Sequence, residues 1–355
     1  MKLRNTETAA PEAVSRSEEV LHSGTADAAR AFPQWLVLGV RTVFANLIWM
    51  ILLVTAVVGL FVPGFMNYDN VQTILWSSVS MAFMVVGMFF VMLTGNLDLS
   101  LESSYGCAPV IGVIAISDLN NVMHVPPELS VLFCLLTGAF IGLVNGGVSV
   151  WLKVNPFLVT LAALLLWRGV VIALIPEGLY DLPKGLTFLG GEKLGGSFPL
   201  AILVGAALFL VTYFVVNRTV FGRAIYAIGS NRQAAYVSGI NVARVQVAVF
   251  VIAGFLSGIG GMIEVGRIGA VVDDLGQGEI MMVFAAAILG GTALAGGSGK
   301  ISGVLAAVLE IGVINDLLNL MGVSPSMTQI VFALVLFAAI ILASFQERLL
   351  GSLRT

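Results

Sequence analysis

Charged residues are scarce in this chain. Of its 355 residues only 10% are charged and 58% are hydrophobic, whereas a soluble globular protein carries about 25% charged residues. The charges cluster and leave long uncharged intervals, which excludes an ordinary soluble domain and indicates a polytopic membrane protein. The formal net charge of -3 is spread over tails and loops, and no basic patch suggests a nucleic-acid partner.

Cysteine and histidine are equally sparse. Cys107 and Cys134 lie in apolar runs, where a thiol is usually a small buried hydrophobe. His22 and His124 are far apart, and no Cys/His cluster has the spacing of metal ligands. Neither a Ser/His arrangement nor a pair of carboxylates on one helix face is present. The sequence therefore predicts no metal, no catalytic residue and no cofactor bound by this chain.

Glycine, in contrast, is abundant, with 40 residues. The stretch "LGGTALAGGSGKISG" (Leu289–Gly303) has a Gly299-Lys300 pair that resembles a phosphate-binding P-loop. That motif requires a glycine where Leu294 stands and a hydroxyl where Ile301 stands. We therefore interpret the stretch as a tight turn between closely packed membrane helices.

The uncharged intervals predict an all-α membrane protein of ten spans, each needing roughly 20 apolar residues. The third and eighth ranges are the weakest, so nine or eleven spans stay open. The ranges are about 42–62, 71–93, 99–117, 128–151, 157–176, 198–217, 244–265, 280–293, 301–320 and 326–345.

Ten spans put both termini on one side of the membrane. That side then holds thirteen of the Lys and Arg residues and the other holds three, with Arg168 inside a span. Because basic residues concentrate in cytoplasmic loops, both termini are predicted to be cytoplasmic. The three outer residues are Lys184, Lys193 and Arg267.

The spans define the domain organisation. Residues 1–40 are polar and predicted to be a disordered cytoplasmic tail. The membrane domain covers 41–347, and 348–355 form a short cytoplasmic tail. The outer connection Glu177–Phe198 is expected to be a short lid or a simple connector.

The longest internal cytoplasmic connection, residues 217–246, predicts a short helix over Asn231–Ser238. Ser230 and Gln233 have the spacing of a capping box, and Gly239 offers a left-handed stop. Ala234, Ala235 and Val237 would be available for contact. A capped helix at the cytoplasmic face suits a soluble partner, whereas the alternative is a solvated loop.

Four motifs in this order resemble the permease subunits of bacterial ABC importers for monosaccharides, the ribose, xylose, arabinose and galactose permease group. The resemblance covers about Phe65 to Glu347. The motifs are "NLDLS" (Asn96–Ser100), "NPFLVTL" (Asn155–Leu161), "FGRAIYAIGSNRQAAYVSGINV" (Phe221–Val242) and "ILGGTALAGGSGKISG" (Ile288–Gly303).

The resemblance implies a fold like that of the vitamin B12-type importer permeases and an assembly in the bacterial inner membrane. Its partners would be a second permease subunit in a homo- or heterodimer, two cytoplasmic ATPase subunits that bind ATP and Mg²⁺, and a periplasmic sugar-binding protein. The capped segment would be a coupling helix that docks on an ATPase subunit. The implied coupling residues are Phe221, Gly222, Arg223, Tyr226, Gly229, Ser230, Asn231, Arg232, Ala234, Ala235, Ser238, Gly239 and Ile240.

Polar residues inside the spans are candidates for a sugar pathway, because isolated charges should face the bundle or a cavity. For each of them a structural hydrogen bond between helices is the alternative. Asn96 and Glu102 stand where the family pattern has glycines. The pathway candidates are Asn96, Asp98, Asn145, Phe157, Thr160, Arg168, Glu264, Asn315 and Asn319, and the remaining charges in or beside the spans are Arg267, Glu310 and Asp316.

Two further alternatives remain open. The glycines of G-x-x-x-G repeats, Gly138-Gly142-Gly146 and Gly254-Gly258, favour close helix packing within the subunit or at a dimer seam. A stand-alone ion-coupled carrier using Glu264, Glu310 or Asp316 is the competing function, although such a carrier needs no capped cytoplasmic helix.

Overall fold

The computed structural model describes residues 47–123, 126–180 and 182–351. Residues 48–339 form one compact unit. All sites below lie in residues 48–339. The expected N-terminal tail, 1–40, lies outside the described residues, as do residues 352–355 of the expected C-terminal tail.

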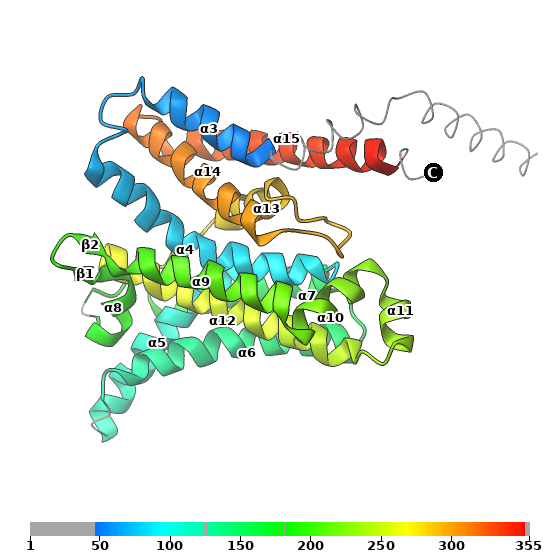
Figure 1. Cartoon of the computed structure of the whole chain (residues 1–355). Coiled ribbons are helices and arrows are strands. Elements are labelled where there is room, and N and C mark those ends of the chain that lie inside the picture. Colours follow the sequence, from blue (N-terminus) through cyan, green and yellow to red (C-terminus); the bar gives the residue numbers. More distant parts are fainter. Residues whose placement is uncertain (1–46, 124–125, 181, 352–355) are drawn as a thin grey trace, which may run out of the picture. The chain divides into compact units, whose positions relative to one another are not determined.

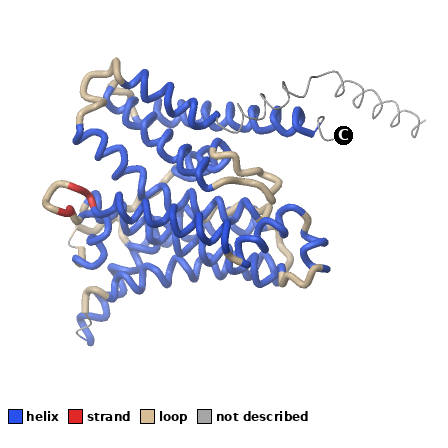
Figure 2. Tube along the Cα trace, viewed as in Figure 1, coloured by secondary structure: helices blue, strands red, loops and turns tan. Residues whose placement is uncertain are grey.

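The described residues are mainly helical (Figures 1 and 2). One small antiparallel hairpin pairs Lys193 with Pro199 and Leu194 with Phe198. In chain order the elements are α3 (Leu47–Gly59), α4 (Tyr68–Leu93), α5 (Leu101–Met123), α6 (Leu129–Trp151), α7 (Pro156–Leu174), α8 (Lys184–Gly191), β1 (Lys193–Leu194), β2 (Phe198–Pro199), α9 (Leu200–Arg218), α10 (Val220–Ser230), α11 (Arg232–Val237), α12 (Val242–Ile268), α13 (Glu279–Leu289), α14 (Ile301–Leu320) and α15 (Pro325–Gly351).

Each of the ten expected spans overlaps a helix, although residues 42–46 of the first span lie outside the described residues. Among the described residues, six helices are long and apolar enough to cross a membrane: α4, α6, α7, α9, α12 and α14. The chain is therefore a multi-pass helical membrane protein, while the count of ten stays a prediction. At 11 residues, α13 is shorter than a span requires. Helix α12 ends at Ile268, so Arg267 lies inside it and not just beyond it as expected.

The centre of the fold is the contact between α6 and α12. A side chain on Gly138 would overlap the carbonyl oxygen of Gly254, and one on Gly254 would overlap that of Gly138. Gly142 lies equally close to the Phe250 carbonyl. These contacts join helices of the same chain. The glycine repeats therefore serve helix packing within the subunit, which was one of the two alternatives, and not a dimer seam.

Helix α12 also packs against α4, α5 and α8. The connection between α7 and α9 contains α8 and the hairpin, which lie at the end of α12 opposite to α11 (Figure 1). Gly190 of α8 approaches the Ile263 carbonyl too closely for any side chain. Trp76 donates to the Gly190 carbonyl at 2.8 Å, and Lys193 lies over the Trp76 ring at 5.2 Å.

The glycine-rich connection between α13 and α14 folds on itself. Gly291, Gly296 and Gly297 have φ between 73° and 86°, a region that glycine favours. The Gly297 N–H donates to the Leu93 carbonyl, and the Ala293 N–H donates to the Ser298 carbonyl. Because these N–H groups have partners inside the protein, they do not converge on a phosphate as a P-loop would.

We expect Gly254→Ala to destabilise the protein, because the added methyl group overlaps the α6 backbone and overpacking costs about 1–3 kcal/mol. The matched control is Gly169→Ala in α7, where nothing lies within 4 Å of an added Cβ. Thermal unfolding in detergent should show a midpoint at least about 2–4 °C lower for Gly254→Ala alone. Equal midpoints for the two variants would contradict the packing.

Candidate functional site

Helix α11 is capped by Asn231. The side-chain oxygen of Asn231 accepts from the Ala234 N–H at 2.9 Å, and the backbone of Asn231 is extended. The sequence-based assignment of the cap to Ser230 was wrong, because Ser230 is the last residue of α10. Its hydroxyl instead donates to the Gly297 carbonyl at 3.4 Å. Asn and Ser are both good caps, and only the end of α10 decides between them.

The predicted left-handed stop at Gly239 is present, with φ +83°. Gly239 and Ile240 donate to the carbonyls of Tyr236 and Ala235, the paired bonds of a Schellman motif. Ala235 packs with Ile228 and Val242 in a small apolar cluster that Ile240 extends. The short helix is thus fixed to the ends of both α10 and α12.

The outer face of α11 is exposed and partly apolar, since Tyr236 and Val237 are 67% and 72% exposed. Ala235 is only 3% exposed, so it is not available at the surface as we expected, and its place among the coupling residues stays a prediction. Of the other coupling candidates, Gly222 is buried, whereas Phe221, Tyr226, Gly229 and Ile240 are half-buried. The exposed ones are Arg223, Ser230, Asn231, Arg232, Ala234, Ser238 and Gly239.

Helix α10 is joined to the glycine-rich connection. The Tyr226 hydroxyl donates to the Gly299 carbonyl at 2.8 Å. Gly229 has no room for a side chain, because the Leu93 carbonyl and the backbone of Gly297 lie against it. The glycine-rich connection and the segment 217–246 are therefore parts of one contact region at the same end of the helices.

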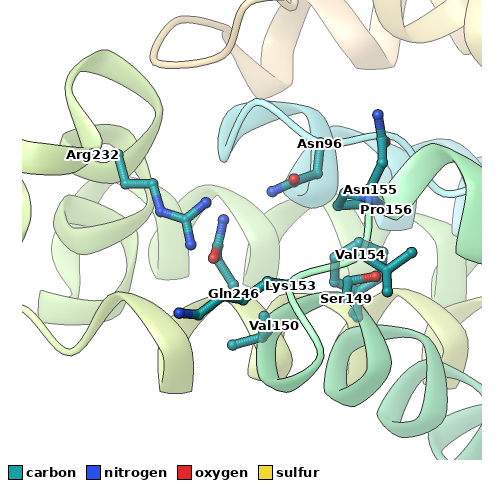
Figure 3. A pocket seen from close by; sticks show the side chains of 10 residues that line it. Asn96, Ser149, Val150, Lys153, Val154, Asn155, Pro156, Arg232 and Gln246 are labelled. Carbon is teal, nitrogen blue, oxygen red and sulfur yellow. The ribbon is translucent and has the colours of Figure 1, made fainter.

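A polar cavity lies at this end, between the start of α12, the end of α6 and α11. It has a volume of about 550 Å³, and we call it the Arg232 cavity (Figure 3). It brings together Asn96, a pathway candidate, and Arg232, a coupling candidate. Its lining residues are Asn96, Ser149, Val150, Lys153, Val154, Asn155, Pro156, Arg232, Gln246 and Phe250.

A second cavity of about 130 Å³ lies between α4, α12, α13 and α14, and we call it the Glu264 cavity. Glu264 is paired with Arg267 (3.0 Å from Nε to Oε2) and accepts from the Ser80 hydroxyl at 2.9 Å. Two pathway candidates, Glu264 and Asn315, meet here. The lining residues are Ser77, Ser78, Ser80, Met81, Glu264, Arg267, Glu279, Met282, Ile311, Gly312 and Asn315.

Glu279 and the serines of α4 line the Glu264 cavity, although neither was among the pathway residues predicted from the sequence. Glu279 stands in the first turn of α13, and one of its carboxylate oxygens is buried without a hydrogen-bond partner among the described residues. The run of Ser77, Ser78 and Ser80 inside an apolar helix was a usable signal, because three hydroxyls there indicate a polar interior face.

Asp98, Ser100 and Asn145 form a buried network instead of lining either cavity. Asp98 accepts from the Ser100 N–H at 2.9 Å and from its hydroxyl at 2.6 Å, and Asn145 donates to the Ser100 hydroxyl at 2.6 Å. In the connection between α4 and α5, burial raises the pKa of Asp98 to about 6, although the bonds from Ser100 lower it. Thr160 lies beside this connection, 3.5 Å from the Leu97 carbonyl.

The other charged residues in or beside the expected spans have hydrogen-bond partners in other segments, although one oxygen of Glu310 is buried without a partner among the described residues. Arg168 contacts Glu102 at 3.3 Å and donates to the carbonyls of Asp273 and Leu275. Glu310 accepts from Thr55 at 2.7 Å. Asp316 accepts from Asn70 at 2.7 Å. Phe157 and Asn319 are exposed and line neither cavity.

In the part of the chain that the structure describes, no three His, Cys, Asp or Glu side chains could hold a metal ion. Apolar helices that enclose two polar cavities, with buried charges paired between helices, are typical of membrane transport proteins. The fold and its sites thus define a multi-pass membrane protein of the transporter class.

Comparison with known proteins identifies the family. The model of the family described as "Branched-chain amino acid transport system / permease component" matches residues 70–340, so the chain belongs to this permease family. The predicted role as a transport subunit and not an enzyme is confirmed by its relatives, which are import permeases. No solved structure matches the chain.

Three relatives show the extent of the similarity. The galactose/methyl galactoside import permease protein MglC of Haemophilus influenzae is 33% identical over 323 residues, which are 85% of this chain and 94% of the relative. The ribose import permease protein RbsC of Escherichia coli K12 is 34% identical over 297 residues (82% and 90%). The Bacillus subtilis ribose permease is 33% identical over 292 residues (81% and 88%).

The cap assignment can be tested by local hydrogen exchange. We expect Asn231→Ala to speed exchange of the Ala234 amide about fivefold, because loss of an N-cap costs about 1 kcal/mol. Ser230→Ala is the matched control and should leave that amide unchanged. Faster exchange of the Ala234 amide in Ser230→Ala, with no change in Asn231→Ala, would instead assign the cap to Ser230.

Proposed function

We propose that this chain is the transmembrane subunit of an ABC importer that moves a monosaccharide, a pentose or a hexose, or a similar small polar solute into the cytoplasm. The observation that carries the proposal is the similarity to ribose and galactose import permeases over more than 80% of the chain. Separate ATPase subunits would bind ATP and Mg²⁺. Transport would then proceed by alternating access, with no chemistry on the solute.

The Glu264 cavity is our candidate for part of the solute pathway. A sugar that leaves water loses several hydroxyl hydrogen bonds, at a cost of a few kcal/mol for each unpaired group. The cavity offers donors and acceptors together, from Ser80 and Asn315 to the Glu264–Arg267 pair. This mixture suits neutral hydroxyl groups, because each sugar hydroxyl both donates and accepts.

Helix α11 is our candidate for the coupling helix that docks on an ATPase subunit. Its outer face presents Tyr236 and Val237 to solvent, and its Schellman motif ties it to α12. The basic residues Arg218, Arg223, Arg232 and Arg244 belong to the same end of the helices. By the positive-inside rule this end is cytoplasmic, in the inner membrane of a bacterium, with ten spans and both termini cytoplasmic.

The proposed assembly has two permease subunits, identical or different, two ATPase subunits and a periplasmic sugar-binding protein. It can be tested by uptake into liposomes that contain this chain with and without the ATPase subunits. We expect ATP inside, together with a loaded binding protein outside, to be required for uptake. Uphill uptake by this chain alone, driven by an ion gradient, would instead identify an ion-coupled carrier.

We expect Gly239→Val to uncouple ATP hydrolysis from uptake while the protein still inserts, because a β-branched residue at φ +83° strains the turn that joins α11 to α12. The control is Gly195→Val, which introduces similar strain (φ +59°) in the hairpin at the other end of the helices. The measurement is the ratio of solute imported to ATP hydrolysed. An unchanged ratio in Gly239→Val would contradict the coupling role.

A further inference from the structure

The Arg232 cavity has a positive lining. Arg232 and Lys153 both contribute to its wall, and none of its lining residues is Asp or Glu. In Figure 3 the Arg232 guanidinium points into the space toward which the Gln246 side chain also extends. A neutral solute cannot neutralise these two cations, whereas an anion in the cavity would be attracted to both.

Two polar residues that line this cavity are buried. Ser149 is only 7% exposed, and its hydroxyl has no hydrogen-bond partner among the described residues. Gln246 is 4% exposed and also lines the cavity. Since buried polar groups are nearly always hydrogen-bonded, the Ser149 hydroxyl needs a partner that the described chain does not supply.

The backbone at Lys153 is strained. Lys153 has φ +56° and is the one non-glycine residue with positive φ among the described residues. It stands in the short connection between α6 and α7, next to Asn155, whose side chain caps α7. A lysine held in the left-handed region costs about 1–3 kcal/mol, and such strain clusters at ligand-binding sites.

From these observations we propose that the Arg232 cavity binds a phosphate-class anion, with Arg232 and Lys153 neutralising its charge and Ser149 and Gln246 completing its hydrogen bonds. A phosphate group offers several acceptor oxygens, which suits this set of separate donors. The side of the membrane to which the cavity opens rests on the proposed function, which makes it the cytoplasmic side. The phosphate would then belong to a soluble phosphate ester or to a lipid headgroup.

Occupancy of the cavity would act on the proposed coupling helix. Arg232 is the first residue of α11, Lys153 follows α6, and Gln246 lies in the first turns of α12. A bound anion would hold these three segments together and restrain α11. The site would therefore make transport sensitive to the phosphate compounds of the cytoplasm or of the membrane.

The test measures protection of a cysteine placed in the cavity wall. In Val150→Cys the new thiol lines the cavity, whereas the native Cys107 and Cys134 are buried. The full chain is placed in phosphatidylcholine nanodiscs and labelled with a small thiol reagent. We expect about 10 mM inorganic phosphate to slow labelling about threefold relative to chloride of equal ionic strength, the factor 1 + [L]/Kd for a Kd of about 5 mM.

Variants test whether protection depends on the residues that line the cavity or on any positive charge near it. In the Val150→Cys background, Lys153→Gln with Arg232→Gln should abolish protection. Gln246→Leu keeps both charges and should still weaken it. Arg218→Gln removes an exposed arginine that does not line the cavity, and it should leave protection intact.

Nanodiscs with phosphatidylglycerol distinguish the two sources of phosphate. Slow labelling in these discs without added phosphate would identify a lipid headgroup, and protection by added phosphate in both compositions would identify a soluble ligand. The proposal is wrong if added phosphate protects in neither composition and phosphatidylglycerol does not slow labelling either. It is also wrong if ribose or galactose protects equally, or if the ATPase subunits alone give full protection.

This outcome is independent of the uptake assay. A chain that imports sugar with its ATPase subunits but shows no phosphate protection would refute only the anion site. A chain that shows protection but no ATP-dependent uptake would refute the proposed function and leave the site standing.

Discussion

The close approach of α6 and α12 is the contact on which the other sites depend. In a lipid environment, helices gain little from burying apolar surface against each other, so close backbone packing between small residues has to supply much of the attraction. Gly138 and Gly254 allow that approach because neither carries a side chain. The position of α12 in turn places Gln246 in one cavity and Glu264 with Arg267 in the other.

Charged side chains among these apolar helices have two kinds of surroundings. Arg168 with Glu102 is satisfied by neighbouring segments, which reduces the cost of burying it. Glu310 is satisfied in part, since one carboxylate oxygen accepts from Thr55 and the other has no partner among the described residues. The groups around Glu264 and Arg232 instead face open volume. The division separates side chains that hold helices together from those that can meet a solute, and the residue types alone do not reveal it.

The sequence therefore predicted some features well and others poorly. Helix positions follow from uncharged runs, and the left-handed stop at Gly239 follows from local backbone chemistry. The partner of each glycine repeat, the cap at Asn231 and the carboxylate of Glu279 depend on contacts between distant segments. Arg168, a pathway candidate, contacts Glu102 and two backbone carbonyls, and its position in the sequence does not indicate these partners. Local signals cannot say which polar residue faces which helix.

The attachment of α10 to the glycine-rich connection has a mechanical consequence. One route from α11 to the Glu264 cavity runs along α12, a continuous helix of 27 residues. The other runs from Gly229 and Tyr226 through the glycine-rich connection into α13 and α14, which carry Glu279 and Asn315. The wall of the Glu264 cavity that α12 forms and the wall that α13 and α14 form are thus both connected to the α10–α11 segment. A displacement of α10 and α11 would therefore move both walls together and would not bend a single helix.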